Sequence, residues 1–132
     1  YKVLLGDRSR QIASRMGIGP AHQAPQCLSC HATFVPAAQR GPKYDIEDGV
    51  GCESCHGASG GWLASHYALD ASHADNVARG LLALEKPMVR ADNCLDCHFG
   101  DAGDRFVNHR MMAAGHPRVS FELELFTALQ KH

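Results

Sequence analysis

The chain lacks long hydrophobic runs, a surplus of positive charge and a secretory signal. No stretch of about 18 consecutive apolar residues occurs, so the sequence encodes no membrane-spanning helix. Its 13 basic and 14 acidic residues give a formal net charge of -1. This balance argues against nucleic acid as a partner, because no basic excess is available to displace counterions from phosphates. The first residue is Tyr1 rather than methionine, and we interpret the chain as processed or partial.

All six cysteines belong to three copies of one pattern, CxxCH. This spacing brings two thiols onto one short turn, where each can form a thioether to a haem vinyl group, and the histidine that follows becomes the proximal iron ligand. The sequence therefore predicts three covalently bound haem c groups. The residues predicted to hold them are Cys27, Cys30 and His31, then Cys52, Cys55 and His56, and finally Cys94, Cys97 and His98.

Two other uses of cysteine pairs explain the pattern less well. Two CxxC pairs could form one four-thiolate zinc site, but the third pair would then have no partner, and zinc does not require a histidine after each second cysteine. A thioredoxin-like redox site would use one CxxC pair rather than three. Covalent haem is the interpretation that uses every cysteine.

Few aromatic residues are available to build a core. The chain has one tryptophan, three tyrosines and five phenylalanines among its 132 residues. This length predicts a single domain, residues 1–132. We therefore expect the haem faces to supply much of the buried apolar area. Because haem is attached covalently outside the cytoplasm, we expect a periplasmic or extracellular location.

Each proximal histidine leaves one axial position on its iron. A second imidazole would give the iron a lower reduction potential than a thioether would, because thioether ligation favours the ferrous state. Histidines outnumber methionines and lie near the motifs, so we expect mainly bis-histidine ligation. Met16, Met88, Met111 and Met112 are the thioether candidates, and we expect the last two to serve in packing. The favoured distal ligands are His22, His66, His109 and His116, whereas we expect His73 and His132 to be solvated.

The hydrophobic pattern predicts a mainly α fold with extensive loops, compact and with little or no sheet. Helices are expected at residues 1–17, ending at Gly17, and at residues 76–84, ending before Pro87. A third is expected around the last motif at residues 91–99, and a surface loop at residues 37–48. On a helix, His109 and His116 would share nearly one face. Residues 121–129 fit a helix, although Phe121, Leu123 and Leu125 also alternate as in a strand.

Five blocks of the sequence, read together, carry a resemblance to a known family. They are residues 8–13, residues 20–31, residues 49–57 with Trp62 to His66, residues 94–100, and His109 to Arg118 with Phe121 to Leu123. They resemble the multihaem c-type cytochromes related to the tetrahaem electron-transfer partner of hydroxylamine oxidoreductase. The resemblance implies closely packed, predominantly bis-histidine haems acting as an electron wire, with the proximal and distal histidines named above.

Two departures from that family matter. Gly60 and Gly61 replace bulkier polar residues, which implies a more flexible loop before Trp62. Family members also commonly carry a further haem motif upstream of the segment that matches residues 1–13. Four distal candidates for three haems leave one imidazole over, which we expect to ligate a haem in a missing upstream segment or in a neighbouring subunit.

Electron transfer between a donor and an acceptor redox protein is the function that the sequence favours. The alternatives are a redox enzyme acting on a small nitrogen or sulfur species at a five-coordinate haem, and a subunit of a haem filament or homo-oligomer with inter-subunit haem contact. An enzyme would need an open iron with nearby acid-base groups. No paired acidic residues indicate such groups, so we predict no catalytic residue and favour a carrier over an enzyme.

Overall fold

The structure is a computed structural model that describes residues 1–101, 105–122, 124–125 and 128. Within that part of the chain it contains helices and loops and no strand, which confirms the prediction of a mainly α fold. In chain order, with η marking a short 3-10 helix, the elements are η1 (Lys2–Leu5), α1 (Asp7–Met16), η2 (Ala21–Gln23), α2 (Pro25–His31), η3 (Ala37–Gln39), η4 (Ile46–Asp48), α3 (Cys52–His56), η5 (Ser59–Gly61), α4 (His73–Ala78), α5 (Pro87–His98) and α6 (His109–Ala113).

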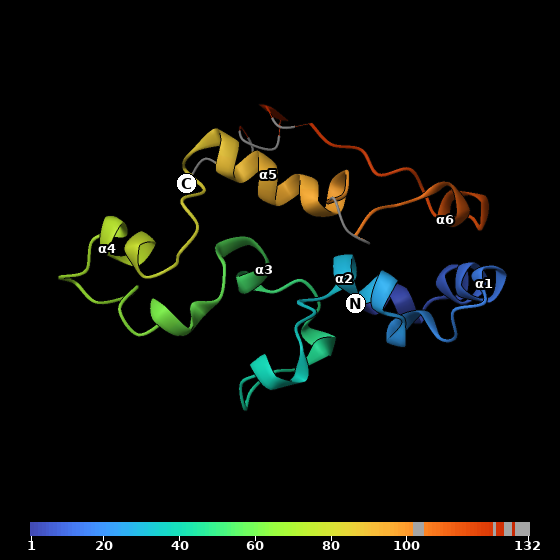
Figure 1. Ribbon diagram of the computed structural model, residues 1–132, viewed down its shortest axis with the longest axis horizontal. Coiled ribbons are helices and arrows are strands. Elements are labelled where there is room, and N and C mark those ends of the chain that lie inside the picture. The colour runs from blue at the N-terminus through green and yellow to red at the C-terminus, as the bar shows by residue number, and fades with distance from the viewer. Residues whose placement is uncertain (102–104, 123, 126–127, 129–132) are drawn as a thin grey trace.

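The helices are strung out around α5 rather than stacked in a bundle. Figure 1 shows α1 and α6 together at one end of the molecule and α4 at the other, with α5 running along one side above α2 and α3. None of the described helices has the length and apolar character needed to cross a membrane.

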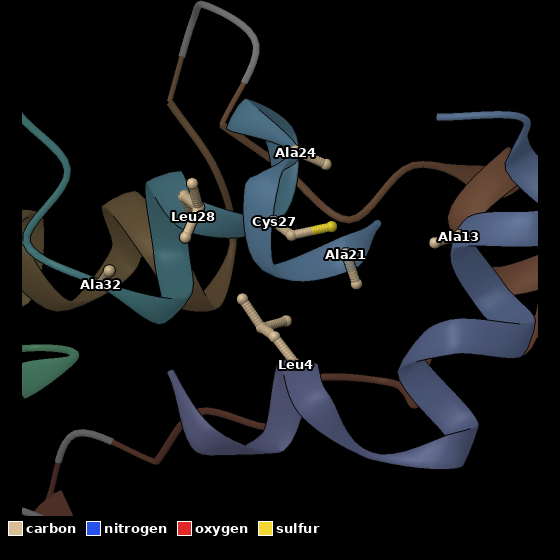
Figure 2. Packing of buried hydrophobic residues seen from close by; sticks show 7 residues of the cluster. All are labelled: Leu4, Ala13, Ala21, Ala24, Cys27, Leu28 and Ala32. Atoms are coloured by element: carbon tan, nitrogen blue, oxygen red, sulfur yellow. The ribbon is translucent and has the colours of Figure 1, made fainter. Parts of the chain in front are cut away.

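Small side chains dominate the main buried cluster, which lies where η1, η2 and α2 meet. Leu4 points from η1 towards the turn that carries Ala21 and Cys27 (Figure 2). Its other members are Ala13, Ala24, Leu28 and Ala32. No side chain in the described part of the chain is completely buried. The aliphatic core is therefore thin, as the composition predicted.

A second cluster joins α1 to α6. Ile12 and Met16 of α1 pack against Met111 and Ala114 at α6. The guanidinium of Arg110 also donates a hydrogen bond to the carbonyl of Met16, at 2.7 Å. Helix α6 is thereby fixed against α1 although the two are far apart in the sequence.

Two of the predicted helices differ from the observed ones in their extent. The predicted helix over residues 1–17 is divided at Gly6, whose backbone is extended, although it does end at Gly17, which has φ +66°. The predicted helix over residues 76–84 is wrong for most of its length, since α4 begins after Ser72 and ends at Ala78. Ser72 and Asp75 form a reciprocal capping box that starts the helix earlier, and Gly80, with φ +107°, follows its end.

The remaining differences concern the last third of the chain. Helix α5 is longer than the turn predicted at residues 91–99, because Pro87 occupies its first turn and opens it. The expected shared helical face of His109 and His116 is wrong, since α6 ends at Ala113. The prediction for residues 121–129 falls partly on residues 123, 126–127 and 129, and His132 also lies outside the described residues.

Candidate haem site

Each CxxCH motif lies in a helix that ends at the histidine of the motif. His31, His56 and His98 are the last residues of α2, α3 and α5. Residues three apart are neighbours on a helix surface, so the two cysteines of each motif share a face and the histidine follows on the next turn. The spacing recognised in the sequence is therefore presented in the same local form three times.

The first and third motifs border one cleft of about 560 Å³. Cys27, Cys30 and His31 line it from α2, and Cys97 and His98 line it from α5. Apolar side chains that include Leu4, Ile12 and Met111 form much of the remaining wall. The cleft thus combines thiols and imidazoles with an apolar lining, which suits a large, flat, mostly apolar group.

His116 lies opposite His31 in this cleft. Their ring centroids are 6.3 Å apart and the ring planes are inclined by 58°. Two imidazoles bonded to opposite sides of one metal ion, with metal–nitrogen bonds of about 2 Å, have ring centroids about 6 Å apart. The spacing of this pair therefore fits two axial ligands of a single iron.

The hydrogen bond of His116 and the surroundings of His31 both suit ligation. The Nδ1 of His116 lies 2.8 Å from the carbonyl of Pro117, so Nδ1 carries the proton and Nε2 the lone pair. Burial lowers the pKa of His31, and His116 and the amino group of Tyr1 lower it further. A metal-binding imidazole must be neutral, and these shifts favour that form.

Arginines of α1 hold the segment that carries His116. The guanidinium of Arg8 donates to the carbonyl of Gly115 at 2.9 and 3.2 Å, and that of Arg15 donates to the carbonyl of Ala114 at 3.1 Å. These bonds satisfy carbonyls at the end of α6 and fix the residue that follows. Nothing local in the sequence marks Arg8 or Arg15 for this role, because the contact joins two segments that are far apart in the chain.

The cysteines of different motifs also come close to each other. A hydrogen bond from Cys97 lowers the pKa of the Cys30 thiol to about 6, and the same bond raises the pKa of Cys97. Burial raises the pKa of Cys94, and the nearby Cys55 raises it further. Helix α5 therefore brings the third motif close to both the first and the second.

Thr33 joins the first motif to the second. Its hydroxyl lies 2.7 Å from the hydroxyl of Ser54 in α3 and accepts the backbone N–H of Gly51 at 2.9 Å. Its own N–H donates to the carbonyl of Gly49 at 2.7 Å. These contacts set how α3 lies relative to α2, so all three motifs meet in one region.

The segment after the second motif carries His66. Its Nδ1 lies 2.6 Å from the carbonyl of Leu63, which leaves the lone pair on Nε2. The ring packs edge-on against Trp62, at 5.8 Å between centroids, and against Tyr67, at 5.1 Å. His66 is exposed and does not line the cleft that holds His31.

The other candidate histidines lie in different surroundings. His22 borders a separate pocket of about 400 Å³ with Leu4 and Ala13. His109 is exposed at the first residue of α6. The Nε2 of His73 lies 3.1 Å from a carboxylate oxygen of Glu85, a contact that occupies the atom it would use to bind iron. The Nδ1 of His98 is 3.0 Å from the carbonyl of Ser120, the arrangement typical of a metal-binding histidine.

The donor set fits haem rather than a directly coordinated ion. Among the described residues, no three side chains of the kinds that bind metals converge on one point. The cysteines therefore do not assemble the four-thiolate site that zinc would require. Haem brings its own four equatorial nitrogens. The protein must therefore supply two opposed imidazoles and a pair of thiols near them.

Three helix-ending CxxCH motifs on a mainly α chain are the marks of a c-type cytochrome. Residues 2–57 match the family described as cytochrome c554 and c-prime. The matched segment contains the first two motifs and covers less than half of the 132 residues. The match supports a c-type cytochrome with covalent haem and a role in electron transport. No curated protein and no solved structure matches the chain.

Proposed function

We propose that the protein transfers electrons through three covalently bound, closely packed haem c groups with mainly bis-histidine ligation. The observation that carries this proposal is the 6.3 Å spacing of His31 and His116 within a cleft bordered by two haem motifs. Bound haem would supply reversible one-electron chemistry, which needs no substrate site.

The side chains of the protein would have three tasks. The cysteine pairs on α2, α3 and α5 would anchor the cofactors, and His31, His56 and His98 would be the proximal ligands. His116 would be the distal partner of His31, and the remaining distal ligands would come from His22, His66 and His109. Two strong-field imidazoles on one iron leave no open position, so the iron would change charge with little rearrangement.

The contacts between motifs support closely packed haems. The interaction between the side chains of Cys30 and Cys97, and the proximity of Cys55 to Cys94, would bring the attachment points of different haems together. The haem at the third motif would lie near the haems at the other two motifs. Electrons could therefore pass through it from the haem at the first motif to the haem at the second. The donor and acceptor would be redox proteins in the periplasm or outside the cell, or further copies of this chain in a filament.

Two measurements on the purified holoprotein test the proposal. Intact mass should show three haems on one chain, and electron paramagnetic resonance of the oxidised protein should show low-spin signals. A mass that corresponds to fewer haems would refute the proposed stoichiometry. A high-spin signal of one spin per chain would instead favour a redox enzyme with a five-coordinate haem.

A further inference from the structure

The cleft bordered by the first and third motifs has positive charge but no carboxylate among the described residues that line it. Arg8 and Arg118 supply the positive charge. The rest of the lining is mostly apolar and includes Leu4, Ile12 and Met111. An anionic group that enters an apolar-lined cleft needs a cation to offset the water that it loses. The lining therefore suits a group that is apolar over most of its area and anionic at one edge.

Of the two arginines, Arg118 is the one whose donors are available. The Nε and Nη2 of Arg8 both donate to the carbonyl of Gly115, at 3.2 and 2.9 Å, so one edge of this guanidinium is occupied. Within the described part of the chain, the guanidinium of Arg118 forms no hydrogen bond and takes part in none of the ion pairs. A guanidinium presents a planar fork of N–H donors that matches a carboxylate.

The segment that carries Arg118 is tied to histidines on both sides of it. The Nδ1 of His116 lies 2.8 Å from the carbonyl of Pro117, and the Nδ1 of His98 lies 3.0 Å from the carbonyl of Ser120. Arg118 lies between these two carbonyls in the sequence, so its backbone is positioned relative to both imidazoles. Both histidines line the same cleft as Arg118.

The exposure of Arg118 fits the polar edge of a haem. Haem carries its propionates on one edge, and when ionised they only accept hydrogen bonds. A haem ligated by His31 and His116 would bury its apolar edge against the apolar wall and keep its carboxylates near solvent. Arg118 is exposed yet lines the cleft, so it lies where the cleft meets solvent.

We propose that the guanidinium of Arg118 binds a propionate of the haem that His31 and His116 ligate. This inference rests on the proposed function, since it needs a haem in this cleft. A cation beside a haem stabilises the reduced form, because reduction adds one negative charge. Arg118 thereby anchors this haem at its polar edge and raises its reduction potential.

Redox titration of the holoprotein followed by visible spectroscopy tests this inference. Arg118→Gln should shift the reduction equilibrium of one haem about tenfold towards the ferric form, which is a change of 59 mV for one electron. Arg118→Lys keeps the charge but not the planar fork, and it should give a smaller shift. Arg40→Gln is the matched control and should leave all potentials unchanged. Arg40 is exposed, does not line the cleft, and donates from Nε to the carbonyl of Val35.

A second readout reports on the propionate itself. With haem isotopically labelled in its propionate carboxyls, redox-difference infrared spectra should show a shifted propionate band in Arg118→Gln but not in Arg40→Gln. Electron paramagnetic resonance of the oxidised protein should stay low-spin in both variants, because neither substitution removes an axial ligand.

The intact mass and the spin state distinguish the two proposals. Three haems with unchanged potentials and an unchanged propionate band in Arg118→Gln would overturn this inference and leave the proposed function intact. A high-spin signal in Arg118→Gln alone would also overturn it, since Arg118 would then act on the position of His116 rather than on a propionate. A wild-type protein without haem at the first motif would overturn both proposals.

Discussion

The ring centroids of His31 and His116 lie 6.3 Å apart, although His31 ends α2 and His116 follows α6. Arg8 and Arg15 of α1 bind the two carbonyls that precede His116, so three separate segments meet at this pair. In the proposed function, axial ligation of one haem would thereby depend on contacts between α1 and the segment that follows α6.

If His116 completes the proposed site, His116→Ala should convert one haem to the high-spin state, because the iron would lose the imidazole on the side away from His31. Electron paramagnetic resonance and the visible spectrum of the oxidised protein would detect the change. His73→Ala is the matched control, since His73 is exposed and paired with Glu85, and it should leave the spectra unaltered. Fully low-spin spectra in His116→Ala would show that another residue completes the His31 site.

Gly61→Ala should destabilise the protein by about 2 kcal/mol, because an added Cβ would clash with backbone that cannot give way cheaply. A Cβ at Gly61 would lie 2.3 Å from the carbonyl oxygen of Arg79, so the segment that carries Trp62 and His66 would have to move. Chemical denaturation followed by circular dichroism measures the effect.

Gly60→Ala is the control for that substitution. A Cβ at Gly60 would meet nothing within 4 Å, so the free energy of unfolding should change by less than about 0.5 kcal/mol. Equal effects at the two positions would contradict the close approach of Gly61 to Arg79. The sequence suggested that Gly60 and Gly61 form a flexible loop. Of these two glycines, Gly61 must be small because of its close approach to Arg79.

How far the sequence predicts this protein depends on whether a feature is local. The CxxCH spacing is local, and each motif does end a helix. The start of α4 is also encoded locally, in Ser72 and Asp75, although the apolar pattern from Val77 to Leu84 favours a helix that begins later. The partner of His31 was not predictable in this way, because Arg8 and Gly115 carry no mark of their contact.

Thr33→Val should lower the free energy of unfolding by about 1–2 kcal/mol. The substitution keeps the shape of the side chain, but it removes the hydroxyl that contacts Ser54 and accepts the N–H of Gly51. Thr33→Ser retains the hydroxyl and should lose much less. Denaturation of the three holoproteins provides the comparison. A loss in Thr33→Ser as large as that in Thr33→Val would contradict the hydroxyl as the main contribution of Thr33, because only Thr33→Val removes it.

Glu53→Gln should change how stability depends on pH. Hydrogen bonds from Ser59 hold the pKa of Glu53 below its ordinary value of 4.5, and the backbone N–H of Ser59 lies 2.7 Å from the carboxylate. Because the folded pKa is below the unfolded one, the ionised carboxylate stabilises the fold above pH 4.5, and this contribution disappears as pH falls through the folded value. Glutamine can still accept the hydrogen bond but carries no charge.

The wild-type protein should therefore exceed Glu53→Gln in stability near neutral pH, and the difference should vanish in acid. Glu53 is exposed, so solvent screening limits the effect to about 0.5 kcal/mol or less. Denaturation at a series of pH values between about 3.5 and 7 would measure it. Glu47→Gln is the control, since the hydrogen bond at Glu47 is made by its backbone. A difference that stays constant with pH would contradict a role for the charge, because only ionisation of Glu53 links its bond with Ser59 to pH.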